Sequence, residues 1–224
     1  MGQGIGNMPV YSPLFEAVGI EMSGGVPPAT DPFGGLNWID VPEGIAFPLQ
    51  RGQRWVLDLH YINPSDKPML VNTGFNVGTI PENEVTAWAS TLQFDAGAID
   101  LPPGDSEVSF RCPWEEDLTV LSIMGHMHEF GTYYRVDWNK ENGDVEQVYE
   151  VPEWTTEHKE WPQLTYHAPG TMEVKAGEEF TTVCKWNNPT DAVLPYPAEM
   201  CTTLVVVYPL TKPLTCVLGT YEDY

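Results

Sequence analysis

The chain has 224 residues, and its 32 Asp and Glu against 10 Lys and Arg give a formal net charge of −22. Because nucleic acids and anionic membrane surfaces bind proteins of the opposite sign, this charge excludes both as expected partners. No apolar stretch is long enough to span a bilayer, so we expect no membrane insertion.

The first part of the chain predicts short strands separated by many turns. Residues 1–50 are rich in Gly and Pro and weakly patterned. Residues 54–63 alternate in a way typical of a strand, with His60 on the face opposite Trp55 and Tyr61. Further short strands follow, and the break at residues 101–105 (LPPGD) is the best domain boundary. We therefore expect two domains, 1–104 and 105–224.

The second part predicts an all-β domain, because Val, Thr and aromatic residues recur in short runs between turn residues. Asn142-Gly143 between polar flanks predicts a hairpin. Roughly eight strands in about 110 residues favour a β-sandwich or jelly roll. The clearest expected strands lie at 106–112, 118–124, 132–138, 145–151, 180–186 and 202–208.

The segment Gly125-His126-Met127-His128 is the strongest candidate for a site. Side chains two apart on a strand share one face, so His126 and His128 are expected to point the same way. With Met200 as a third donor they would form a mixed imidazole and thioether site, and thioether ligation favours copper, Cu(I) in particular. The alternative is that the two histidines are only structural or surface residues.

All four cysteines lie in the second half of the chain, and none forms a C-x-x-C pair. An even number of widely spaced cysteines suggests two disulfides and an oxidising compartment, either secreted, periplasmic or at the cell surface. Three connectivities are open from the sequence alone.

Several motifs together resemble the copper type II, ascorbate-dependent monooxygenases, which include dopamine β-monooxygenase and the peptidylglycine α-hydroxylating monooxygenases. The motifs occur in family order over about residues 30–216, and the chain is most similar to divergent bacterial members. The matching segments are 41–49 (VPEGIAFPL), 57–64 (LDLHYINP), 125–131 (GHMHEFG), 183–188 (VCKWNN) and 199–201 (EMC).

The resemblance implies two jelly-roll domains, each with one copper ion. The copper that meets O2 would be bound by His126, His128 and Met200, and His60 matches one ligand of the other copper, which supplies an electron. Ascorbate or another small reductant would be the electron donor. The resemblance also implies which cysteines pair, namely Cys184 with Cys201 and Cys112 with Cys216.

One departure from the family is plain, because the chain contains no adjacent His-His pair to complete the second copper site. The chain could be a fragment whose partner supplies the pair, a protein that binds one copper, or a protein that has lost its metals. We expect a complete C-terminal jelly roll after a partial N-terminal β-sandwich, whose open sheet would pair with a partner or a second copy.

Two functions follow as hypotheses. The first is O2-dependent C–H hydroxylation at a His/His/Met copper site. The alternative is a non-catalytic copper-binding or structural subunit of a larger extracellular assembly. The family's peptide-binding arginine corresponds to Met124 here, so we do not expect recognition of a peptide carboxylate.

Overall fold

The computed structural model describes residues 21–22, 41–48, 66–70, 75–76, 80–160 and 162–222. The chain divides into two compact units, residues 1–86 and 87–224. This division lies upstream of the boundary expected at 104/105, because β5 (Ser90–Asp95) is hydrogen-bonded into the main sheet of the second unit.

The described part of the first unit contains short strands and turns. β1 (Glu21–Met22) pairs with β3 (Phe75–Asn76) in antiparallel register. β2 (Ile45–Ala46) follows a turn at Gly44, and a 3-10 turn spans Glu82–Glu84. The expected strand at 54–63, including His60, lies outside the described residues, so the partial N-terminal β-sandwich stays a prediction.

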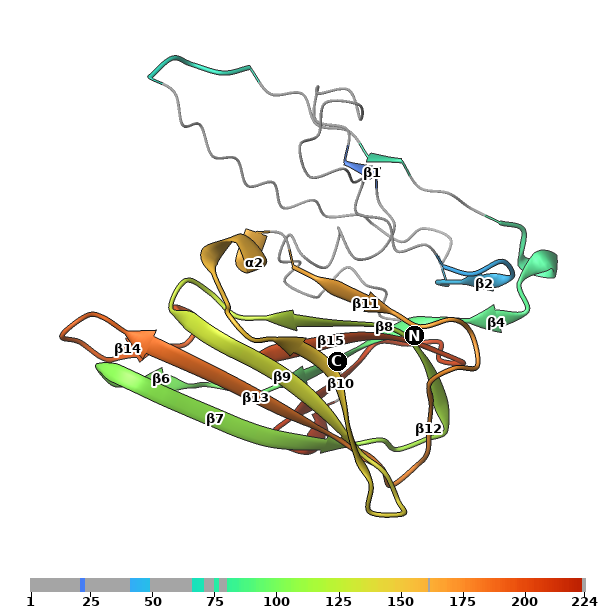
Figure 1. The fold of residues 1–224 in the computed structure, drawn as a ribbon. Coiled ribbons are helices and arrows are strands. Elements are labelled where there is room, and N and C mark those ends of the chain that lie inside the picture. Colours follow the sequence, from blue (N-terminus) through green and yellow to red (C-terminus); the bar gives the residue numbers. More distant parts are fainter. Residues whose placement is uncertain are drawn as a thin grey trace. The chain divides into compact units, whose positions relative to one another are not determined.

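Two main sheets form the second unit (Figure 1), and their strands are antiparallel except for β16, which pairs with β5 in parallel. The first sheet has the order β10-β9-β13-β7, and the second has the order β11-β8-β15-β5-β16-β17, with β12 also paired to β8. The first sheet consists of β7 (Gly104–Pro113), β9 (Gly131–Asn139), β10 (Val145–Val151) and β13 (Glu179–Asn188). Besides β5, the second contains β8 (Leu118–His126), β11 (Leu164–Tyr166), β12 (Glu173–Val174), β15 (Thr202–Tyr208), β16 (Leu214–Val217) and β17 (Thr220–Glu222).

The order of these strands is that of a jelly roll, because the chain passes repeatedly from one sheet to the other. All six of the clearest expected strands are present, and four of them are longer than the sequence pattern predicted. The predicted jelly-roll β-sandwich is therefore confirmed for the second unit. The remaining short elements are β4 (Ala87–Trp88), β6 (Asp100–Leu101), α2 (Thr156–Glu160) and β14 (Leu194–Pro195).

The core lies between the two sheets. Phe94, Trp114 and Phe180 are almost fully buried and meet edge to face, with ring centroids 4.8–5.8 Å apart. Such pairs add about 0.5–1.5 kcal/mol beyond the burial of their surface. Two disulfides link the sheets, Cys112–Cys216 and Cys184–Cys201, and no cysteine is free. This is the pairing that the family resemblance implies.

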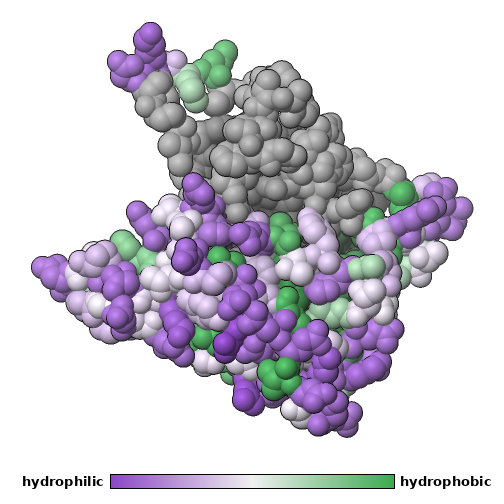
Figure 2. Space-filling model, in the orientation of Figure 1, coloured by the Kyte–Doolittle hydropathy of each residue, from purple (hydrophilic) through white to green (hydrophobic). Residues whose placement is uncertain are grey.

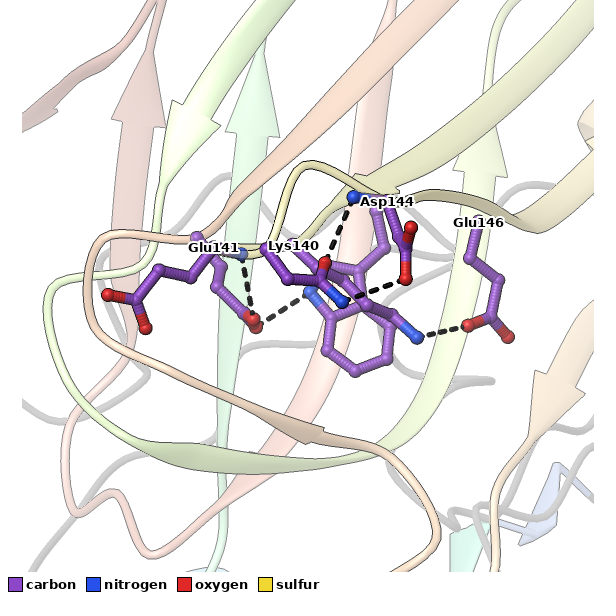
Figure 3. A network of polar contacts seen from close by, with 7 residues as sticks. Lys140, Glu141, Asp144 and Glu146 are labelled. Carbon is purple, nitrogen blue, oxygen red and sulfur yellow. Dashed lines mark hydrogen bonds and ion pairs between the residues drawn. The ribbon is translucent and has the colours of Figure 1, made fainter.

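The predicted hairpin at Asn142-Gly143 joins β9 to β10 (Figure 3). Gly143 has a φ of +89°, which favours glycine, and its N–H donates to the Lys140 carbonyl oxygen at 2.9 Å. The Lys140 ammonium lies 2.6 Å from Glu146 and 4.1 Å from the centroid of the Trp138 ring. The turn therefore has both the backbone geometry and the side-chain contacts to fix the strand register.

Polar side chains cover most of the described surface in the view of Figure 2. On the outer face of the β10-β9-β13-β7 sheet, the few cations are paired with carboxylates, as in Arg111–Glu179 and Lys185–Glu107. Within the described ranges, no helix has the length and apolarity needed to cross a membrane.

Candidate metal centre

The two histidines of the H-x-H motif meet at the end of β8. The strand ends at His126, so His128 lies in the extended segment beyond it and not on the strand itself. The alternation continues past the strand, because Met127 between them is fully buried in the core. The Nε2 atoms of His126 and His128 are 3.1 Å apart, and the ring planes are nearly perpendicular at 82°.

Hydrogen bonds fix the orientation of His128. Its Nδ1 lies 3.0 Å from the carbonyl oxygen of Ala198, and its own carbonyl oxygen accepts from the Trp154 indole at 3.1 Å. Because a carbonyl oxygen can only accept, Nδ1 must carry the proton, and the Nε2 lone pair of His128 then faces His126. This is the tautomer that a metal-binding histidine needs.

His126 is buried, with 7% of its surface exposed. Burial, assisted by the fields of the His128 ring and the Lys159 ammonium, lowers the pKa of His126 to about 3. The imidazole is therefore neutral at physiological pH and keeps a free lone pair. Its Nδ1 has no hydrogen-bond partner, and among the described residues its Nε2 contacts only His128.

The segment that carries Met200 lies against this pair. Thr202 at the start of β15 is the ladder partner of His126. Cys201 belongs to the core, and Thr202 lies on the face of His126, its ladder partner; Met200 directly precedes Cys201, just before the strand begins. Met200 is buried, with 6% of its surface exposed. The structure thus brings the segments that carry the three residues of the predicted site to one end of the sheet.

Three further residues hold the site together, and the sequence analysis did not single them out. Glu199 is fully buried, and its carboxylate accepts from the backbone N–H of His128 at 3.0 Å, from that of Phe130 at 2.7 Å and from the Trp186 indole at 3.1 Å. Trp154 binds the His128 carbonyl oxygen. The sequence places Glu199 beside Met200 in the E-M-C segment, but its burial and its partners are seen only in the structure.

The other histidines do not join the pair. His158 of α2 accepts from the Thr155 N–H at 3.0 Å, and His167 lies on the segment after β11 and is half-buried, with its pKa lowered by burial. His60 lies outside the described residues. In the part of the chain that the structure describes, no three His, Cys, Asp or Glu side chains are grouped as metal ligands, so no third described side chain of these types joins the pair.

Comparisons with known proteins give no family for this chain. No protein-family model matches it, and no curated protein resembles it in sequence. Among solved structures, the Yersinia pseudotuberculosis-derived mitogen is similar over 60% of this chain and 90% of its own, with 10% identity and a TM-score of 0.31. Infectious bursal disease virus, Gx strain, is similar over 63% of this chain and 41% of its own, with 10% identity and a TM-score of 0.26. Similarities this weak carry no argument about function.

Proposed function

We propose that this chain is a copper-binding protein whose copper is bound by His126, His128 and Met200. The observation that carries the proposal is the 3.1 Å separation of the two Nε2 atoms. A tetrahedral ion with metal–nitrogen bonds of about 2.0 Å requires its nitrogen ligands to be about 3.3 Å apart. The two imidazoles are therefore already spaced as a pair of ligands.

The protonation states also fit a metal. His126 is neutral, and His128 carries its proton on Nδ1, so His126 donates the hydrogen bond between the two Nε2 atoms in the metal-free chain. Transfer of the His126 proton to Nδ1 would leave both Nε2 lone pairs available to a metal. Without a metal, the buried ring of His126 would be left with one polar contact at Nε2 and an unpaired Nδ1. A metal would bind at Nε2 and leave the His126 proton on Nδ1, so it would replace the Nε2 contact without satisfying Nδ1.

The third donor supports copper over zinc. Zinc sites take their ligands from His, Cys, Asp and Glu, and among the described residues no third such side chain joins the pair. Glu199 is already occupied by three hydrogen-bond donors. The thioether of Met200, two residues before the ladder partner of His126, is a soft donor, and soft donors favour Cu(I).

The activity that we propose for this centre is O2-dependent hydroxylation of a C–H bond, as the family resemblance implies. Copper would supply one electron and the open coordination position for O2. Ala198 would hold the His128 imidazole in the tautomer that a metal needs, and burial would keep water from His126. Met124, in the position of the family's peptide-binding arginine, is 2% exposed, which argues against a peptide carboxylate as substrate.

A non-catalytic copper-binding subunit is the second candidate, and one observation favours it. The sequence has no adjacent His-His pair to complete an electron-donating copper. Hydroxylation of one C–H bond by O2, with release of water, consumes two electrons beyond those of the substrate, and one Cu(I) supplies one. For catalysis, a partner chain or a small reductant such as ascorbate would have to supply the other. The two disulfides fit export to an oxidising compartment.

Copper titration of the metal-free full chain tests the metal assignment. We expect His126→Ala to lose one tightly bound Cu(I) per chain and Met200→Leu to bind it more weakly. His158→Ala and Met172→Leu are matched controls, because His158 lies outside the pair and Met172 is a buried methionine of the core. Unchanged copper binding in His126→Ala would refute the proposal.

Oxygen consumption tests whether the isolated chain can catalyse hydroxylation without a second copper. With copper and ascorbate supplied, we expect the isolated chain to consume O2 slowly and to release peroxide, since the second electron arrives only by collision. Fast O2 consumption without peroxide, coupled to product, by a monomer with a single copper would contradict this expectation.

A further inference from the structure

Glu199 connects the two chain segments that carry the proposed ligands. It directly precedes Met200, and its carboxylate accepts from the backbone N–H groups on both sides of Glu129, those of His128 and Phe130. These N–H groups lie beyond the end of β8, where no ladder partner satisfies them. Glu199 therefore fixes the turn after the H-x-H motif to the segment before β15.

A second buried glutamate in the same sandwich has the same pattern of partners. Glu178 accepts from the backbone N–H groups of Lys175 and Glu141, at 3.0 and 3.3 Å, and from the Trp138 indole at 2.8 Å. It is 7% exposed. Figure 3 shows the backbone N–H of Glu141, in the hairpin, donating to this carboxylate. None of its partners is a residue of the proposed metal centre, so Glu178 serves as an internal reference for Glu199.

We propose that Glu199 is a positioning residue that sets the place of the His128 imidazole relative to Met200 in the metal centre. The inference rests on the proposed copper site. The His128 ring is held from its backbone by Glu199 and from its Nδ1 by Ala198, the residue before Glu199. A shift of Glu199 would therefore move both anchors of His128 and the adjacent Met200 together.

The test is Glu199→Gln with Glu178→Gln as the matched control. Glutamine has one acceptor oxygen and one NH2 group in place of the carboxylate, so at least one of the three N–H donors must face another donor. We expect both variants to lower the melting temperature by a similar amount. In the metal-free full chain, only Glu199→Gln should speed amide hydrogen exchange at His128 and Phe130 and change the 15N signature of the His128 Nδ1–H tautomer.

Copper then gives the second measurement. Loss of a residue that orients a ligand typically weakens metal binding about 10–100-fold. We expect Glu199→Gln to weaken Cu(I) binding by that factor and Glu178→Gln to leave it unchanged. If Glu199→Gln does not fold, Trp186→Phe against Trp138→Phe makes the same comparison with a smaller perturbation.

The outcomes separate the two claims. Equal effects of the two glutamine variants on the His128 signals, or no effect of either, would overturn the positioning role. If the wild-type chain binds no copper while Glu199→Gln still alters the His128 tautomer, the positioning role stands and the proposed function fails.

Discussion

Each end of the β9–β13 ladder has a buried glutamate that accepts from one tryptophan indole and two backbone N–H groups. The residues around the two glutamates differ. Glu199 binds the Trp186 indole where Trp186 pairs with Gly131, at the start of β9. Glu178 binds the Trp138 indole at the other end, next to the pair formed by Glu179 and Asn139. A buried carboxylate with three N–H donors thus links strands and loops at each end of the sandwich. Only Glu199 also lies beside the proposed metal ligands.

Each end also has its own disulfide. Cys184–Cys201 ends beside Met200, and Cys112–Cys216 lies near Glu178, since Cys112 pairs with Phe180 in the β7–β13 ladder. We call the Glu199 region the site end and the Glu178 region the far end. If the comparison is right, damage at the far end should lower stability alone, and damage at the site end should also affect copper.

Disulfide removal should give the largest effect on stability. The far-end bond closes a separation of 104 residues and the site-end bond one of 17. Loop-closure entropy predicts losses of about 4.7 and 3 kcal/mol in the free energy of unfolding. Denaturant unfolding of the paired variants Cys112→Ala with Cys216→Ala, and Cys184→Ala with Cys201→Ala, measures both. The Cys184→Ala, Cys201→Ala variant should lose less stability but bind Cu(I) more weakly. Equal copper affinity in the two double variants would contradict the distinction between the two ends.

Glycine substitution tests the packing at each end. A Cβ on Gly131 would lie 2.3 Å from Met127 Cε and 2.7 Å from Trp154 Cδ1. We expect Gly131→Ala to cost up to about 3 kcal/mol by overpacking and to weaken copper binding through Trp154, which holds the His128 carbonyl. Gly143→Ala at the far end meets open space and should cost about 1 kcal/mol from its positive φ alone, with copper unchanged. Thermal melts and copper titrations of the two variants check this.

Acid should destabilise the site end specifically. The pKa of His126 falls from 6.5 to about 3 on folding. Below pH 6.5 the His126 imidazole therefore binds a proton in the unfolded chain but not in the folded one. As a result, the free energy of unfolding falls as the pH decreases toward 3. The loss should reach about 2 kcal/mol at pH 5 in metal-free protein. Urea unfolding between pH 7 and pH 4 should show a shallower slope for His126→Ala than for the wild type, and identical slopes would contradict the assignment.

The indoles give the smallest and cleanest pair of changes. Trp186→Phe and Trp138→Phe each remove one N–H donor from a buried carboxylate, with an expected loss of about 1.5 kcal/mol each. Chemical unfolding should give similar values for the two variants, while only Trp186→Phe lowers copper affinity. A copper effect of Trp138→Phe would mean that the two ends are coupled.

Much of the second unit could be predicted from the sequence, because its strands alternate and end at strong turns such as Asn142-Gly143. The place of β5 in the second unit could not be predicted. The Pro-rich break at 101–105 is a local signal that put β5 in the first domain, whereas β5 pairs with β15 more than a hundred residues later in the chain.

The same distinction holds at the site. His126, His128 and Met200 were marked by their chemistry. The contacts of Glu199, Trp154 and Trp186 depend on how separate strands end beside one another, and no local pattern encodes that.

X-ray absorption at the copper edge on the copper-loaded full chain tests the central claim most directly. For Cu(I) the account predicts two imidazole nitrogens and one sulfur around the metal, with the sulfur contribution lost in Met200→Leu and copper itself lost in His126→Ala. A copper environment without sulfur, or one that is the same in Met200→Leu, would contradict it.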